Sequence, residues 1–154
     1  MTPTPHPVGP VGMLSLNEAQ AIVAAALTEA RRRGVAVAVA VAGPAGDLLA
    51  LARMDGIPPI SAESARRKCQ TVALTWRSTS SFAESMRADL AAEPEYFHGM
   101  HHVEGVMTIG GGLPVVRDGG LAGAIAVSGA STEDDVGIAE AGRAAFDATV
   151  GNGR

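Results

Sequence analysis

The sequence predicts an α+β fold, in which a five-stranded antiparallel sheet is flanked by helices. Amphipathic helical patterns occupy both ends of the chain. Between them, short apolar segments come in pairs joined by tight turns, Gly43–Asp47 and Asp118–Gly120. Strands joined by such turns run antiparallel. The order helix, hairpin, two helices, three strands, helix differs from the regular strand–helix alternation of a parallel sheet.

Four helices are predicted from caps and apolar spacing. The first follows a capping box formed by Ser15 and Glu18, and Gly34 ends it after a basic turn. Ser61 is expected to cap a second helix that runs to about Trp76. The segment Ser81–Glu84 matches another capping box, whose helix Pro94 closes, and Thr132 precedes the last helix, about Glu133–Val150.

The strand with the clearest pattern is Val35–Ala42, which alternates Val and Ala without a polar residue. Because successive strand residues point to opposite faces, one face should be valine and the other alanine. Both faces should be buried, and the alanine face should let a helix pack closely. The other predicted strands are Leu48–Met54, Val106–Ile109, Leu113–Arg117 and Leu121–Ser128.

Size and composition favour one domain over residues 14–150, between an N-terminal arm (1–13) and a short tail (151–154). Only 3% of the residues are aromatic, so each core side chain buries little area, and we expect a homo-oligomer to complete the burial. A net charge of −4 without a long basic stripe argues against nucleic acid binding.

Location is predicted from three features. No segment has the roughly 20 unbroken apolar residues of a membrane span, and the start lacks the pattern of a signal peptide. The single Cys69 excludes an internal disulfide and fits a reducing cytoplasm. It is expected to be a small core residue on the inward face of its helix.

The segment Phe97–Pro114 concentrates the candidate chemistry. It holds His98, His101, His102 and Glu104, and imidazoles with a carboxylate suit zinc, iron, nickel or copper. The metal ligands are predicted to be the three histidines, with His101, His102 and Glu104 as catalytic candidates. Acid–base or substrate-binding roles remain open because histidine titrates near neutrality, and a plain polar loop is the remaining alternative.

Two further groups are candidates for binding. The backbone of Gly110, Gly111 and Gly112 could approach an anionic cofactor; alternatively, these glycines form a tight bend that packs a strand. Arg53, Asp55 and Lys68 could bind or polarise a carboxylate substrate, although surface ion pairs are the simpler explanation for each of them.

A set of short motifs resembles the GlcG/HbpS-like family. They are ARMDG (52–56), K-x-x-T (68–71), GGGLPV (110–115), the turn at 118–119, AVSGASTEDD (126–135) and AEAG (139–142). The resemblance covers about Leu14–Phe146. It implies a profilin-like sandwich, and dimers that assemble further, up to octamers. It also implies haem or iron binding, in a family that supplies the C-terminal domain of PduO-type corrinoid adenosyltransferases. This chain departs from the family pattern at Gly43, where an aspartate is usual, and in its H-x-x-H-H segment.

Three hypotheses follow. The first is a small-ligand-binding protein that holds haem or a transition metal such as iron or zinc near the three histidines. The second is an enzyme of hydrolase, lyase or isomerase type, which acts on a small organic acid or ring compound through a metal or through histidine acid–base chemistry. The third is an assembly module without chemistry of its own.

Overall fold

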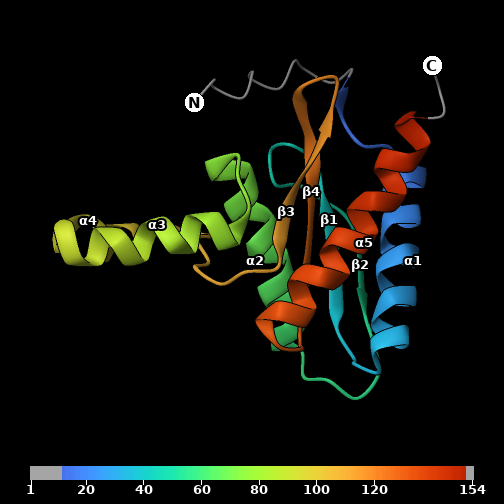
Figure 1. Ribbon diagram of the computed structural model, residues 1–154, viewed down its shortest axis with the longest axis horizontal. Helices are drawn as coiled ribbons and strands as arrows, with labels where there is room; N and C mark the ends of the chain where they lie inside the picture. The colour runs from blue at the N-terminus through green and yellow to red at the C-terminus, as the bar shows by residue number, and fades with distance from the viewer. Residues whose placement is uncertain (1–11, 152–154) are drawn as a thin grey trace.

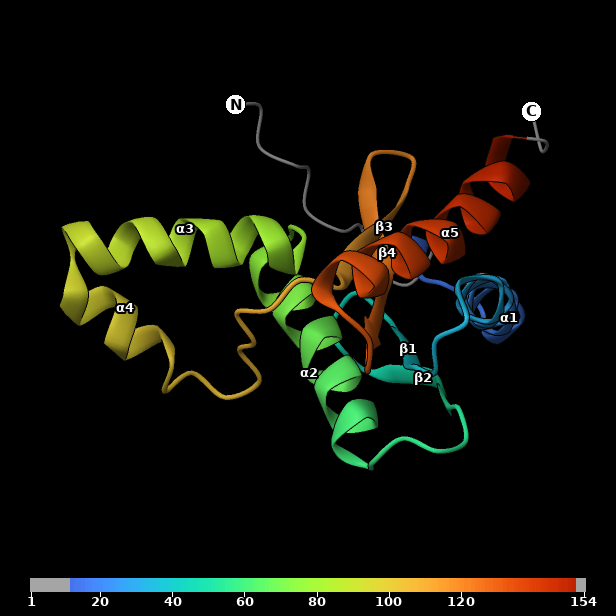
Figure 2. The same cartoon turned by 60° about the horizontal axis from the view of Figure 1, so that its bottom comes forward.

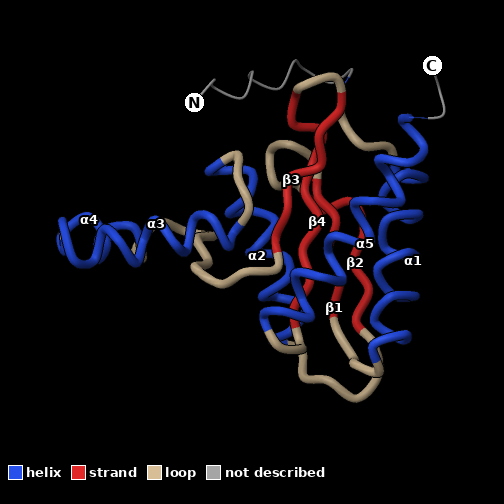
Figure 3. Tube along the Cα trace, in the orientation of Figure 1, coloured by secondary structure: helices blue, strands red, loops and turns tan. Residues whose placement is uncertain are grey.

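The computed structural model describes residues 12–151 and contains an antiparallel sheet between two layers of helices (Figures 1 and 2). Its elements are α1 (Leu16–Arg33), β1 (Ala38–Ala42), β2 (Leu48–Arg53), α2 (Ile60–Thr75), α3 (Thr79–Ala92), α4 (Pro94–Met100), β3 (Gly112–Arg117), β4 (Gly120–Ser128) and α5 (Thr132–Gly151). The strand order is β2-β1-β4-β3, with every neighbour antiparallel (Figure 3). The predicted α+β class with a flanked antiparallel sheet is therefore confirmed. Most of the predicted arm, and all of the tail after residue 151, lie outside the described residues.

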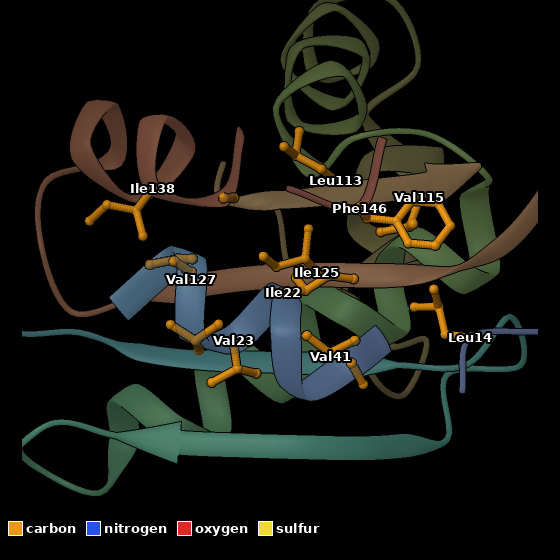
Figure 4. Close-up of a cluster of buried hydrophobic side chains, with 14 of the residues drawn as sticks. Leu14, Ile22, Val23, Val41, Leu113, Val115, Ile125, Val127, Ile138 and Phe146 are labelled. Carbon is orange, nitrogen blue, oxygen red and sulfur yellow. The ribbon is translucent and has the colours of Figure 1, made fainter. Parts of the chain in front are cut away.

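The central strand β1 separates two apolar layers, as its alternating sequence predicts. Val37, Val39 and Val41 join the larger core, which α1 and α5 cover. Figure 4 shows Val41 in this cluster, gathered with side chains of both helices. On the opposite face, the small side chains of Ala38, Ala40 and Ala42 pack with residues of α2. Alanine keeps that face flat, so α2 can lie close to the sheet.

Cys69 is part of this close packing. It is fully buried on α2, and its thiol lies 3.4 Å from the carbonyl oxygen of Ala40. Burial raises the pKa of the thiol to about 12, so it stays protonated near neutrality. Cys69 is therefore a core residue, as predicted.

The helix ends agree with the sequence only in part. The capping box of α1 is present, and Gly34 ends the helix in a left-handed conformation. The cap of α3 is Ser78 rather than Ser81, whose backbone N–H it binds. Ser131 rather than Thr132 accepts the N–H of Asp134 at the start of α5, and α2 begins after Pro59 without a side-chain cap.

No helix in residues 12–151 is long and apolar enough to cross a bilayer.

The prediction of a fifth strand at Val106–Ile109 is wrong, because the described residues form a four-stranded sheet and this segment is a loop. The side chain of Thr71, on α2, takes the place of a neighbouring strand. Its hydroxyl donates to the carbonyl of Gly105 and accepts from the N–H of Met107, at 2.9 and 2.8 Å. Backbone groups held by a side chain in this way do not extend a ladder.

Helices α3 and α4 project sideways from the domain as a two-helix extension (Figures 1 and 2). We call residues 79–100 the helical arm. Phe82, Ala83 and Met86 are buried on α3, whereas α4 has no buried residue. The arm therefore presents the histidine-containing helix α4 to the surroundings.

The close crossing of α1 and α5 generates a stability prediction at Gly142. A Cβ at this position would overlap the Cδ1 atom of Ile125 and lie 3.2 Å from the carbonyl oxygen of Ile22. Gly142→Ala should therefore lower the free energy of unfolding by about 1–3 kcal/mol through overpacking, although alanine is the better helix former. Urea denaturation measures the change.

The matched control is Gly99→Ala, because Gly99 is also helical but has no atom near its Cβ position. This variant should be neutral or slightly stabilising. Equal stability of Gly142→Ala and the wild type would show that the two helices are not in tight contact.

Candidate functional site

Lys68 does not form the surface ion pair that the sequence suggested as one explanation, because it is one of the most buried side chains among the described residues. Its exposed fraction is 1%. The amine donates to the carbonyl oxygen of Val127 at 2.8 Å and lies 3.4 Å from Oδ2 of Asp135. Lys68 comes from α2, Val127 from the end of β4 and Asp135 from the first turn of α5. We call Lys68, Gly111, Val127 and Asp135 the buried lysine site.

Burial disfavours the charged forms of both Lys68 and Asp135, and their mutual attraction opposes this effect. Burial lowers the pKa of Lys68, and the attraction of Asp135 opposes that shift only in part. Burial likewise raises the pKa of Asp135, against the pull of Lys68 and of the hydrogen bond from the N–H of Ala130. Removal of either partner would leave the other as an uncompensated buried charge.

The triple glycine closes the site. Gly111 has a φ of +124°, and a Cβ there would lie 2.5 Å from the Val127 oxygen and 2.9 Å from the Lys68 amine. Only glycine can take this backbone conformation at such close approach. The N–H of Gly112 donates to the hydroxyl of Thr79 at 2.9 Å, which ties the loop to the base of the helical arm. This geometry supports a tight bend that packs a strand.

Gly110, the first of the three, lies on the other side of the bend, where it lines a cavity of about 280 Å³. We call this cavity the glycine pocket. Its remaining lining residues are Ser80, Ala83, Arg87, Thr108, Ile109 and Thr132. None of the three predicted histidine ligands is among them.

The histidines are exposed on and directly after α4. Within residues 12–151 there is no group of three His, Cys, Asp or Glu side chains placed to hold a metal ion. His101 is nevertheless ordered by its neighbours: its Nδ1 lies 2.8 Å from the carbonyl oxygen of Phe97, and the two rings are 4.5 Å apart. The Phe97 ring also contacts His98, edge to face, at 5.4 Å.

Glu104 lies on the exposed loop that returns from the arm toward α2. Its neighbour there is Arg66. The pKa of Arg66 is raised mainly by hydrogen bonding to Glu63 and to a smaller extent by the charge of Glu104. The proposed catalytic group of His101, His102 and Glu104 therefore lies on a surface of the arm and its return loop.

The three predicted substrate-binding residues do not lie together. Arg53 and Asp55 line a cavity of about 380 Å³ near the end of β2, together with Arg31 and Met54. Lys68 does not line this cavity, and its amine instead contacts Asp135 and the carbonyl oxygen of Val127. Arg53 and Asp55 are thus separate from the buried lysine site.

Sequence reasoning missed Asp135, a member of the buried lysine site, and Thr79, whose hydroxyl holds the loop beside it. In the sequence, Asp135 is one of three acidic residues in the first turn of α5, and nothing there distinguishes it from the other two. No sequence pattern points to Thr79. The distinguishing feature of Asp135 is burial, with an exposed fraction of 3%. Its neighbour Asp134 instead forms a partly exposed ion pair with Arg33 of α1 at 2.9 Å.

These features define a small α+β domain with a buried lysine–aspartate pair under a glycine bend. A family model described as "Haem degrading protein HbpS-like" matches residues 14–144, and the chain therefore belongs to this family. It is 37% identical to Protein GlcG of Escherichia coli K12 over 119 residues, which cover 75% of this chain and 81% of that protein.

Two solved structures support the same family. The crystal structure of HbpS matches with a TM-score of 0.75 and 34% identity, and covers 86% of this chain and 89% of that one. The crystal structure described as a PduOC–haem complex matches with a TM-score of 0.74 and 29% identity, and covers 86% and 94%. The GlcG/HbpS-like resemblance predicted from the motifs is confirmed.

The buried pair generates a prediction about stability. Lys68→Met alone should lower the free energy of unfolding by about 3–5 kcal/mol, because Asp135 is left buried without its cation. A neutral carboxyl group tolerates burial, so the loss should shrink in mildly acidic buffer and grow in mildly alkaline buffer. Chemical denaturation at several pH values measures both effects.

The double variant Lys68→Met/Asp135→Asn should lose less than the sum of the single variants, because no lone charge remains. Arg67→Met is the control on the same helix. Its ion pair with Glu63 is exposed, so its removal should matter little. Additive losses in the double variant would mean that Lys68 and Asp135 act independently.

Proposed function

We propose that this chain is a haem-binding protein whose helical arm supplies an imidazole that would hold the haem iron, with His101 as the leading ligand. The observation that carries this proposal is the 2.8 Å contact between Nδ1 of His101 and the Phe97 carbonyl. A carbonyl oxygen can only accept, so Nδ1 carries the proton, and the neutral ring keeps its lone pair on Nε2. Such an orienting bond is typical of metal-bound histidines.

Haem suits these residues better than a bare metal ion does. A structural or catalytic zinc site needs three or four protein ligands, and residues 12–151 provide no group of three. A porphyrin brings four nitrogen ligands of its own, so a single imidazole is enough to hold the iron. His98 and His102 are further candidates to hold the iron. When bound, haem supplies an iron centre for ligand binding or redox chemistry.

Family membership supports the same reading. The family description names haem degradation, and the neighbouring PduOC structure is a haem complex. The family also implies a profilin-like sandwich, which the flanked antiparallel sheet supports. The cytoplasmic location stays a prediction from the single cysteine.

A second copy of the chain completes this proposal. Haem is a large apolar ring, but the histidines of a single chain are exposed. The arm and its return loop also expose large apolar side chains: Leu90 (44%), Tyr96 (48%), Val103 (42%) and Ile109 (48%). A neighbouring subunit that packs on this surface would bury both the apolar side chains and the haem face. The alternative, an enzyme that acts on a small organic acid or ring compound, is supported by the cavity that Arg31, Arg53 and Asp55 share.

Haem titration tests the histidine ligand. Purified protein without a His tag should develop a Soret band at one haem per chain. His101→Ala should weaken haem binding by about tenfold or more, since even partners that merely orient a metal ligand contribute about 10–100-fold. His98→Ala and His102→Ala should have smaller effects.

Added imidazole separates coordination from packing, because it should restore the spectrum of His101→Ala if the lost group is an iron ligand. Full haem occupancy in the triple variant, with all three histidines replaced by alanine, would refute the proposal. The histidines would then form only a polar loop.

Assembly is tested separately. Light scattering at micromolar concentration should give a homo-oligomer larger than a dimer, and Tyr96→Asp should shift it toward smaller species by placing a charge on the apolar arm surface. The control is Leu74→Asp, because Leu74 is also exposed but lies on α2. A wild-type mass equal to the 15.6 kDa monomer would contradict the assembly.

A further inference from the structure

We propose that the glycine pocket binds the carboxylate group of a small organic anion, independently of haem. The pocket lies on the outer side of the bend at Gly110, between the start of α3, the start of α5 and the loop before β3. Its volume of about 280 Å³ is at the small end for ligand sites, which suits a molecule of a few carbon atoms.

The charge in the pocket favours an anion. Among the described residues, Arg87 is the only charged side chain that lines the pocket, and it forms no ion pair with any of them. Arg66 and Arg67, in contrast, both bind Glu63. Four more described arginines also lack an ion pair, namely Arg31, Arg53, Arg77 and Arg143, but none of them lines this pocket. An arginine fork without a carboxylate partner is suited to bidentate binding of a carboxylate ligand.

Polar groups surround the arginine. Ser80, Thr108 and Thr132 bring three hydroxyl groups to the lining. Ser80 and Thr132 lie in the first turns of α3 and α5, where the positive ends of the helix dipoles add to the field. The acids closest in sequence to these residues, Glu84 and Glu133, do not line the pocket.

The backbone at Gly110 also favours a bound anion, independently of the side chains that line the pocket. The N–H groups of Ile109 and Gly110 donate to no acceptor within residues 12–151, although Gly110 is buried. A buried backbone donor without a partner is rare and costs free energy. A bound carboxylate would accept from such a donor. Gly110 also has to lack a side chain, because a Cβ would lie 2.5 Å from Ser80 Oγ and 2.9 Å from Thr132 Cγ2.

Amide NMR of the full chain tests the proposal, with acetate, lactate and succinate as probes. Saturable shifts should be confined to Ile109, Gly110 and the start of α5. Acetamide, which has the shape of acetate without its charge, should give none. Inorganic phosphate distinguishes the anion class, and saturable binding of phosphate alone would overturn the carboxylate assignment.

Two variants locate the site. Arg87→Gln should weaken carboxylate binding by about tenfold, because it removes a charge-assisted hydrogen bond. The control is Arg31→Gln, because Arg31 lines the separate cavity beside Arg53 and Asp55. This variant should leave carboxylate binding unchanged. Loss of binding in Arg31→Gln with retention in Arg87→Gln would overturn the proposal, as would the absence of saturable shifts with every carboxylate.

Ser80→Ala is a milder second probe, because it removes a hydroxyl from the pocket without removing charge. It should weaken binding by a few-fold while the protein stays folded. His101→Ala should bind the carboxylate as the wild type does, so a failure of the haem proposal leaves this test intact.

Discussion

The structure depends on the contacts that the buried amine of Lys68 makes. The amine joins α2 to the end of β4 through the Val127 carbonyl, and to α5 through Asp135. These partners belong to both sides of the sheet, since α2 covers the alanine face and α5 the valine face. A single cation therefore connects the two helical layers at one end of the sheet. Such a pair contributes less to net stability than to the choice of one arrangement, because its desolvation offsets much of its attraction.

Gly111 makes this arrangement possible. Its backbone passes directly over the amine, and its carbonyl accepts from the N–H of Val127 at 3.0 Å. The same bend has two consequences on its outer side. It directs the chain into β3, and it places Gly110, whose N–H has no acceptor within residues 12–151, in the lining of the glycine pocket. The buried lysine site and the glycine pocket thus share one loop, with Lys68 and Asp135 on one side and Arg87 on the other.

The helical arm is a separate part of the molecule. Its base is buried at Phe82 and Met86, and its return loop is bound to α2 by Thr71, but α4 touches no core. An exposed helix with histidines and large apolar side chains gains burial only from something outside the chain, which is the reason that haem and a second subunit are proposed together. The domain is held by its own core, whereas the arm depends on its partners.

The sequence by itself determined the features that rest on neighbouring residues. The valine–alanine alternation of β1, the capping box of Ser15 and Glu18 and the hairpin turn at Asp118–Gly119 all form as predicted, because each depends on periodicity or on contacts within a few positions. Only the tertiary structure decided the site. From the sequence alone Lys68 resembles a surface residue. Its burial depends on contacts with Val127 and Asp135, which lie 59 and 67 positions further along the chain. Residues 106–109 have strand-like composition, but the hydroxyl of Thr71 on a distant helix takes the N–H of Met107. Burial and pairing over such separations depend on how the layers pack, which no local pattern encodes.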